Sequence, residues 1–78
     1  MTKLPLISSD VVIKRLRKAG FDMAPHQGKG SHIALFRHGA DGEKLLVIVP
    51  RRDPVPRGTL ISILKQARMT KDEFAELE

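Results

Sequence analysis

The sequence predicts an α+β fold in the order α-β-β-β-α, a three-stranded antiparallel sheet with helices packed on one face. Three observations predict it. Apolar residues recur at helical spacing near both ends of the chain, two apolar runs of strand length lie between them, and short turn-forming segments join these runs. Short connections favour an antiparallel meander. A chain of 78 residues suits one domain, so we expect residues 1–78 to form a single domain.

The first helix is predicted over residues 9–19. Ser8 and Ser9 are candidate N-cap residues, and Asp10 in the first turn suits the positive end of the helix dipole. Apolar residues recur at helical spacing as far as Gly20, a candidate C-cap. The polar face of this helix carries four cations: Lys14, Arg15, Arg17 and Lys18. These cations suit contacts to phosphates, and they suit a solvated helix surface equally well.

Three strands are predicted in the middle of the chain. Phe21–Ala24 forms a short first strand that Pro25 ends, because proline cannot donate to a ladder. The second strand is expected over Ser31–His38 and the third over Glu43–Val49, with a turn at Asp41-Gly42 between them. Both longer strands are apolar on both faces. Helices cover one face, and we expect a partner or a second copy, as in a homodimer, to cover part of the other.

A basic connector leads from the sheet to the second helix. Pro50 stops the third strand, and two further prolines keep residues 51–57 extended. Gly58 and Thr59 then open a helix. Its core stripe has the spacing i, i+3, i+4 and i+7 and comprises Leu60, Ile63, Leu64 and Ala67.

A short last helix is predicted from one strong local signal. Thr70 and Glu73 have the spacing of a capping box, and Met69 and Phe74 are placed as its hydrophobic staple. We expect this helix to have a structural role.

The charge is distributed unevenly along the chain. Fourteen Lys and Arg against nine Asp and Glu give a net charge of +5, and four of the acids lie within the last seven residues. The body before them is more basic than the total, which favours an anionic partner such as nucleic acid, an acidic protein or a membrane surface. The chain has no Trp or Tyr and three Phe, so platforms for stacking bases are poorly supplied.

The composition also limits the chemistry that the protein can perform and the cellular compartment in which we expect it. The chain has no cysteine, which excludes disulfides, thiolate chemistry and cysteine-based zinc sites. No apolar run approaches the roughly 20 residues of a membrane span. The first residues lack the long apolar region of a signal peptide. We therefore expect a cytoplasmic protein that makes no use of a membrane.

A glycine-rich basic turn precedes the second strand. Gly28-Lys29-Gly30 runs directly into Ser31-His32, which places a titratable side chain at a strand end beside a basic loop. Such a group is well placed to meet a polyanion. The alternative is an ordinary hairpin turn followed by a histidine that only caps or packs.

The order α-β-β-β-α with a basic body is the layout of a double-stranded-RNA-binding domain. Five further pieces occur in order at characteristic separations: Ala19-Gly20-Phe21, Gly30-Ser31-His32, Val49-Pro50-Arg51, Gly58-Thr59-Leu60 with Ile63–Ala67, and the capped segment Thr70–Phe74. In these pieces, from about Ser9 to Leu77, the chain resembles the HicA family of mRNA-interferase toxins, which have a fold like that of double-stranded-RNA-binding domains.

The resemblance implies an endoribonuclease toxin of a type II toxin–antitoxin pair. Such a toxin cleaves mRNA and thereby inhibits translation, and a cognate HicB-type antitoxin protein masks it. The family's catalytic residue is the histidine of the Gly-Ser-His motif, which falls on His32 here. Many members carry a second histidine shortly after the Pro-Arg that follows the third strand. This chain has Arg52-Asp53-Pro54-Val55-Pro56 there, which leaves a second acid/base group open.

The chemistry of RNA cleavage agrees with this assignment. RNA carries its own nucleophile, the 2′-hydroxyl, so cleavage needs a base, an acid for the leaving oxygen and cations for the developing charge. Histidine titrates near neutrality and can take either proton role. Lys29 and the Gly30 amide can contact the phosphate, and the Ser31 hydroxyl can donate to it. Further phosphate contacts are expected from Lys14, Arg51 and Arg57. The scheme needs no metal and no cofactor.

The remaining histidines are weaker candidates. His26 lies in the loop before the motif and is expected at the surface, although a His26–His32 acid/base pair is conceivable. His38 ends the second strand and is expected to be a turn residue. The acids Asp41, Glu43 and Asp53 do not form an obvious metal cluster.

Two other functions remain open from the sequence. The first is a non-catalytic RNA-binding module that uses the same basic surface, with His32 as a contact. The second is an interaction protein whose basic surface and apolar sheet face serve only an acidic partner. An RNA-binding measurement at low salt distinguishes the interaction protein, which would not bind, from the nuclease and the RNA-binding module, because phosphate binding strengthens as salt falls.

Overall fold

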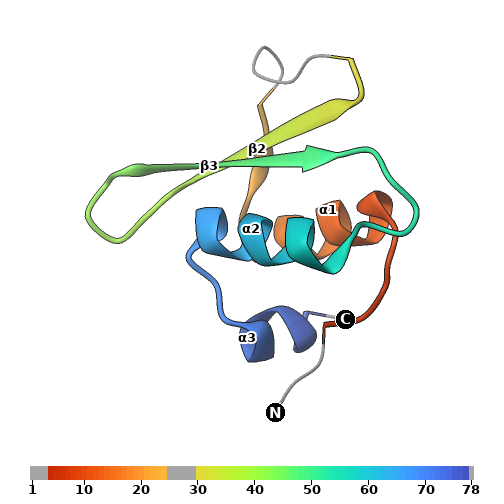
Figure 1. The fold of residues 1–78 in the computed structure, drawn as a ribbon. Coiled ribbons are helices and arrows are strands. Elements are labelled where there is room, and N and C mark those ends of the chain that lie inside the picture. The colour runs from red at the N-terminus through yellow and green to blue at the C-terminus, as the bar shows by residue number, and fades with distance from the viewer. Residues whose placement is uncertain (1–3, 25–29, 78) are drawn as a thin grey trace.

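The computed structural model describes residues 4–24 and 30–77. The elements follow the order α1-β1-β2-β3-α2-α3 (Figure 1). Their bounds are α1 Ser9–Lys18, β1 Asp22–Met23, β2 His32–His38, β3 Lys44–Pro50, α2 Arg57–Ala67 and α3 Lys71–Ala75. The predicted α+β fold and its element order are confirmed. In the described part of the chain, no helix combines the length and the apolar character that crossing a membrane requires.

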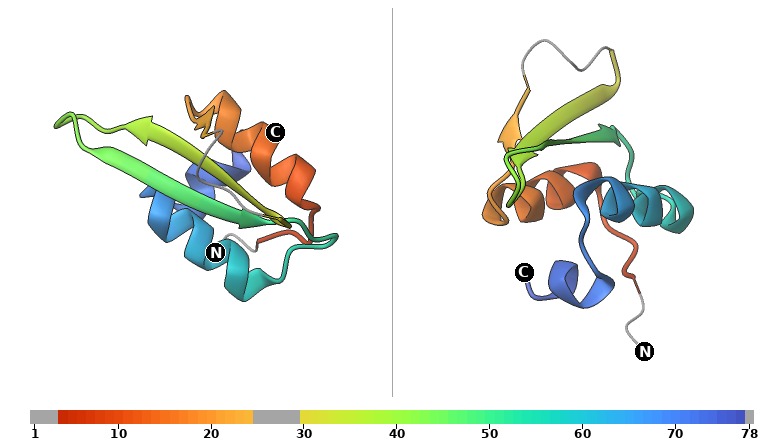
Figure 2. Two further views of the ribbon diagram at one scale, coloured as in Figure 1. Left: turned by 90° about the horizontal axis from the view of Figure 1, so that it is seen from above. Right: turned by 90° about the vertical axis from the view of Figure 1, so that its left-hand side faces the viewer.

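The strands form one antiparallel sheet in the order β1-β2-β3. In β2 and β3 the pairing runs without interruption from His32 opposite Pro50 to His38 opposite Lys44. Helices α1 and α2 lie side by side under one face of this sheet, and α3 lies beyond them on the side away from the sheet (Figures 1 and 2). The prediction that the helices pack on one face is therefore confirmed.

Local signals explain where α1 begins and ends. The Ser8 side chain accepts a hydrogen bond from the Val11 amide at 3.4 Å and caps the helix, and Asp10 lies in the first turn. Gly20 follows the C-cap with φ +98°, a left-handed conformation that glycine adopts without strain. The amide of Phe21 then donates to the carbonyl of Leu16 at 3.1 Å, so the chain turns sharply back toward the sheet.

The core lies between the inner face of the sheet and the helices. Its largest fully buried side chains come from every layer: Phe21, Phe74, Leu16, Leu35, Leu60, Ile63, Val12, Val47, Val49 and Val55. The predicted core stripe of α2 is buried along its whole length. The capping box of α3 is present with both of its hydrogen bonds, and it directs Phe74 into the core.

The strand boundaries differ slightly from the prediction. The first strand is shorter than expected and comprises Asp22 and Met23, although the Ala24 amide still donates to the Ala34 carbonyl of β2 at 2.9 Å. The third strand begins one residue later and includes Pro50, which is its last residue. An edge strand tolerates proline because the missing N–H has no ladder partner there. The outer edge of β3 is partly closed by Gln66 of α2, whose Oε1 accepts from the Ile48 amide at 2.9 Å.

The second face of the sheet carries apolar side chains, as expected. Directly opposed residues share a face, so Phe36 lies with Leu46, and Ala34 with Ile48, on the side away from the helices. Leu46 is 39% exposed, Phe36 and Ile48 are half-buried, and Ala34 is buried. Covering of this face by a partner or a second copy stays a prediction.

Candidate functional site

His32 lies at an end of the sheet where two distant segments meet. It is the first residue of β2, it is exposed, and its partner across the ladder is Pro50. One step further out, the Arg51 amide donates to the Ser31 carbonyl oxygen at 2.7 Å. The Gly-Ser-His and Pro-Arg segments, which the sequence singled out separately, are therefore joined by the last bonds of the β2–β3 ladder.

Gly30 lies in the turn that leads into β2. It is exposed and has φ +59°, in the left-handed region where side chains other than glycine are disfavoured. Gly30 and Ser31 therefore lie where the sequence predicts them, next to His32. Lys29 and His26 fall in residues 25–29 and lie outside the described residues.

The N-terminus of α1 is attached to the connector that follows β3. The Ser9 amide donates to the Arg52 carbonyl at 2.8 Å, and the Arg52 amide donates to the Ser9 hydroxyl at 3.2 Å. Ser9 is 6% exposed, and it is the one buried polar residue among the residues that the structure describes. This reciprocal pair holds the first turn of α1 against the residues after Arg51.

A shallow hollow lies at this junction between the helix and the connector. Its lining combines two arginines, two carboxylates and two serines: Ser8, Ser9, Asp10, Arg51, Arg52 and Asp53. Sequence reasoning selected Arg51 and missed Arg52, although the Arg-Arg pair is visible in the chain. The sequence does not show that the start of α1 lies next to these two arginines.

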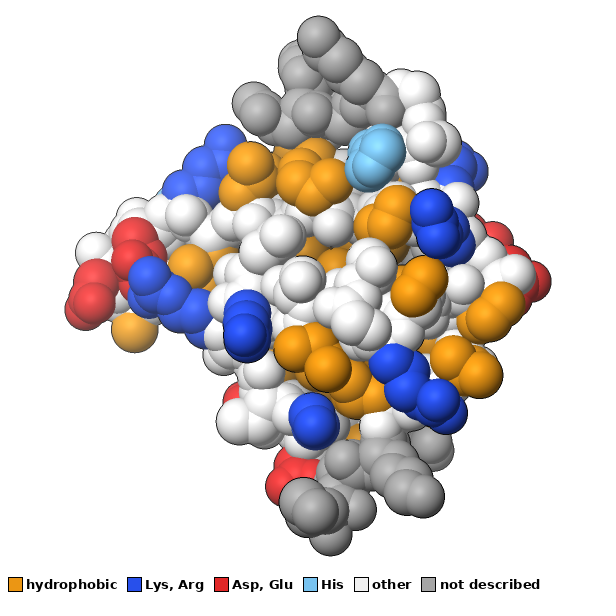
Figure 3. Space-filling view, in the orientation of Figure 1, with side chains coloured by type: hydrophobic (Ala, Val, Ile, Leu, Met, Phe, Trp, Pro, Cys, Tyr) orange, Lys and Arg blue, Asp and Glu red, His pale blue; other side chains and the backbone are white. Residues whose placement is uncertain are grey.

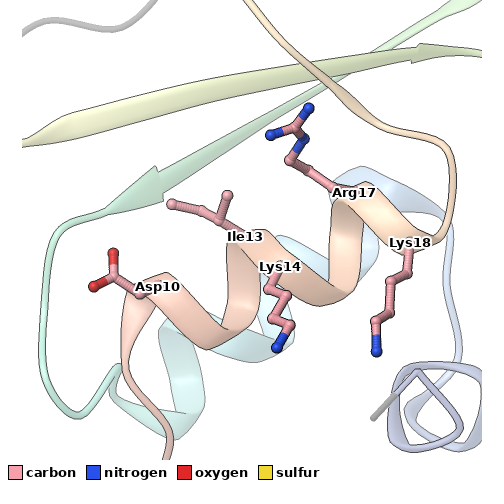
Figure 4. Close-up of a pocket in the computed structure, with 5 residues that line it drawn as sticks. All are labelled: Asp10, Ile13, Lys14, Arg17 and Lys18. Atoms are coloured by element: carbon pink, nitrogen blue, oxygen red, sulfur yellow. The ribbon is translucent and has the colours of Figure 1, made fainter.

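Lys14 does not join this group. A second hollow follows α1 and is lined by Asp10, Ile13, Lys14, Arg17 and Lys18. Figure 4 shows that Lys14 and Lys18 point away from the strands, whereas Arg17 extends toward them. These three cations of α1 therefore point in two directions, and the guanidinium of Arg15 lies over the Phe74 ring, 4.9 Å from its centroid.

Arg57 has a structural contact. It is the first residue of α2, and its Nε donates to the Leu4 carbonyl at 3.2 Å. Beside it, the Val55 amide donates to the Ile7 carbonyl at 2.7 Å. Arg57 therefore helps hold the segment before α1 in place, and a phosphate contact by its remaining N–H groups stays a prediction.

His38 lies at the opposite end of β2 from His32. It is the last residue of the strand rather than a turn residue, and it is paired with Lys44. Its ring meets that of Phe36 edge-on, with 6.0 Å between the centroids. The two histidines are six positions apart along β2, which corresponds to about 20 Å, so His38 does not share a site with His32.

The surface around these elements is predominantly basic. On the side seen in Figure 3, Lys and Arg side chains are spread across the face, while Asp and Glu gather at its margins. Among residues 4–24 and 30–77, no three His, Asp or Glu side chains are grouped so that they could hold a metal ion. His32, Arg51 and Arg52 lie at the same end of the sheet, so an imidazole that can transfer a proton and guanidinium groups that can bind a phosphate belong to neighbouring residues.

Comparison with known proteins adds one finding. Residues 9–69 match the model of a family described as "HicA toxin of bacterial toxin-antitoxin". The matched region runs from the first residue of α1 to the end of the segment after α2 and includes the junction around His32. The capped segment that begins at Thr70 lies beyond the matched residues. No curated protein matches the chain.

Proposed function

Because the chain belongs to the HicA family of bacterial toxins, we propose that this toxin is an endoribonuclease. It cleaves mRNA and so inhibits translation, in a type II system whose HicB-type antitoxin protein masks it. The family membership supports a toxin with an antitoxin partner. The observation that carries the nuclease proposal is the position of His32, exposed at the start of β2 and joined through the ladder to Pro50 and Arg51.

In the proposed reaction His32 accepts the proton of a ribose 2′-hydroxyl. The 2′-oxygen attacks the adjacent phosphorus, the bond from phosphorus to the 5′-oxygen breaks, and that oxygen takes a proton from water. A cyclic phosphate and a free 5′-hydroxyl result. Proton transfer by a positioned histidine typically contributes about 10²–10⁴-fold.

The cations around His32 stabilise the charge that develops on the phosphate. Arg51 follows Pro50 directly, and its amide donates to the Ser31 carbonyl oxygen, so its backbone is fixed next to the paired residues His32 and Pro50. Lys29, Gly30 and Ser31 complete the proposed phosphate contacts at this end of β2, and Lys14 and Arg57 are proposed as additional contacts. A guanidinium can bind two phosphate oxygens at once, which suits a phosphodiester in reaction.

We propose further that the reaction is independent of metal ions. RNA supplies the nucleophile and a histidine supplies proton transfer, so neither role requires a metal-bound water. The substrate places the activity in the cytoplasm.

The test is cleavage of a long single-stranded RNA in EDTA by the parent chain and by His32→Ala. We expect the variant to lose about 10²–10⁴-fold in rate. His32→Gln, which keeps a polar side chain, should lose as much, and Lys65→Ala, on the exposed side of α2, should cleave like the parent. Equal cleavage by the parent and both His32 variants would show that His32 is structural.

The same experiment distinguishes the proposed nuclease from the alternative function, a non-catalytic RNA-binding module. If the parent and His32→Ala both bind RNA and neither cleaves it, the chain is a non-catalytic RNA-binding module. In that case His32→Ala should weaken binding, because the imidazole would be a contact only.

A further inference from the structure

We propose that Phe36 is a stacking platform for one base of a single-stranded RNA that crosses the outer face of the sheet, the face turned away from α1 and α2. The inference rests on the proposed function, since it presumes an RNA substrate, and it adds a base-binding subsite to the phosphate contacts near His32. The left view of Figure 2 looks onto this outer face.

Phe36 and His32 lie on the same face of β2. Side chains alternate along a strand, so His32, Ala34, Phe36 and His38 share one side. Leu35, on the other side, is fully buried against the helices together with its partner Val47, which identifies the side of His32 as the outer one. Phe36 is four positions from His32 along β2, which corresponds to about 13 Å. An RNA strand cut at His32 and running along β2 therefore meets Phe36.

The three phenylalanines of the chain have different environments. Phe21 and Phe74 are 1% and 0% exposed and belong to the core. Phe36 is half-buried, and the ammonium of Lys44 lies over its ring, 5.1 Å from the centroid. A hydrated cation on a flexible stem, rather than a packed apolar side chain, occupies this ring face. A base can take that position while the ammonium moves to a neighbouring phosphate.

The neighbours of Phe36 complete a surface suited to a nucleotide. Leu46, directly opposite on β3, is 39% exposed and extends the apolar platform, while the His38 ring stands against the edge of Phe36 at 89°. On the β1 side, the exposed Asp22 occupies the position opposite Phe36. Its carboxylate repels phosphates, so the RNA backbone is directed to the β3 side, where Lys44 lies.

This combination favours a nucleotide over a protein side chain as the occupant. An apolar protein segment would cover Phe36 and Leu46 and would desolvate Lys44 and His38 without pairing them. A nucleotide brings a flat π-face for the ring and a phosphate for the cation together. Stacking of a base on an aromatic side chain tolerates all four bases, so the subsite would add affinity and position rather than strict sequence selection.

The composition of the chain permits a direct optical test. The sequence contains no Trp or Tyr, so Phe36→Trp introduces the only indole. The matched control is Ile61→Trp, because Ile61 is 37% exposed and lies on α2, on the other side of the sheet. The probe is a short single-stranded RNA with 2′-O-methyl groups throughout, which lacks the nucleophile for cleavage. A second probe carries abasic residues.

We expect the RNA to quench the fluorescence of Phe36→Trp and to leave that of Ile61→Trp nearly unchanged. The abasic probe should quench much less, because it has no base to stack. In a separate binding assay, Phe36→Leu keeps an apolar side chain and loses the ring. It should bind the RNA about 5- to 150-fold more weakly than the parent, the range that stacking energies predict.

Three outcomes would overturn the inference. RNA could bind to Phe36→Trp without quenching, as anisotropy of a labelled probe would show, or it could quench both tryptophans equally. The purified antitoxin could quench Phe36→Trp where RNA does not, which would assign the face to the protein partner. In each case cleavage by the parent continues to support the proposed function. A parent chain that neither binds nor cleaves RNA would overturn both proposals.

Discussion

The Arg51 amide donates to the Ser31 carbonyl oxygen at 2.7 Å, one step beyond the paired residues His32 and Pro50. Through this bond, the ends of β2 and β3 continue their pairing into the two motifs that flank the candidate site. The geometry between the histidine and the arginine is therefore set by the whole β2–β3 ladder. A site built on paired strands is held more rigidly than one built on loops.

Arg51→Ala should weaken RNA binding and reduce its salt dependence. If Arg51 contacts one phosphate of a single strand, removing it should lower the slope of log K against log salt by about 0.7. Lys65→Ala removes one exposed charge from α2 and should leave the slope unchanged. Titrations of a labelled RNA over a range of salt concentrations measure both. Equal slopes for the parent and Arg51→Ala would remove Arg51 from the phosphate contacts.

Ser9→Ala should destabilise the fold by about 1–3 kcal/mol. The hydroxyl is buried and accepts from the Arg52 amide at 3.2 Å, so its loss leaves that N–H without its side-chain acceptor. Ser62→Ala, on the exposed side of α2, is the matched control and should change stability little. Urea unfolding of the three chains tests this. Equal midpoints would mean that water replaces the lost bond.

Leu16→Ala should cost about 2–5 kcal/mol of unfolding free energy. Leu16 is 0% exposed in the centre of the core, and truncating it both removes apolar contacts and leaves a cavity. The matched change, Leu6→Ala, concerns a leucine that is 55% exposed and should shift stability by no more than about 0.5 kcal/mol. Thermal or urea unfolding of the two variants measures both losses of stability. Similar losses from the two leucines would contradict the core described above.

The capping box of α3 should make stability depend on pH in the acid range. The Thr70 amide donates to the Glu73 carboxylate at 2.9 Å, and this bond, with a further contribution from the Thr70 hydroxyl, holds the pKa of Glu73 below its ordinary value of 4.5. A carboxyl with a lowered pKa in the folded state stabilises the fold above its unfolded pKa. That stabilisation is lost as the pH falls through the lowered, folded pKa.

Glu73→Gln should therefore narrow the difference in stability between neutral and strongly acid pH. The measurement is the urea midpoint of the parent and the variant across this range, with Glu76→Gln as the control at an exposed position of the same segment. Parallel curves for the parent and Glu73→Gln would show that the carboxylate does not couple to folding.

Helix ends were predictable because their signals are local. The Ser8 cap, the left-handed Gly20 and the Thr70–Glu73 capping box each depend on residues within one turn, and all are present. The first strand was predicted too long because its length depends on its pairing with β2, and the paired strand comprises Asp22 and Met23. A pattern of apolar residues within a four-residue segment does not indicate how far that segment pairs with a neighbouring strand.

The candidate site was predictable in part. The sequence identified His32 at a strand end, because a glycine-rich turn before an apolar run marks the start of a strand. It also selected Lys14 and Arg57 for their charge alone. The structure turns Lys14 away from the strands and uses Arg57 Nε to hold the Leu4 carbonyl. Charge is a property of a residue, whereas the direction of a side chain depends on its packed neighbours.

The sequence by itself determined the order of elements, the core stripes and the histidine of the Gly-Ser-His motif, because each is encoded over a few adjacent residues. Only the tertiary structure decided that Arg51 would lie beside Ser31, that Ser9 would contact Arg52, and which side of β2 would face the helices. These relationships join segments far apart in the chain. They follow from strand register and helix docking, which the energy of the whole fold selects.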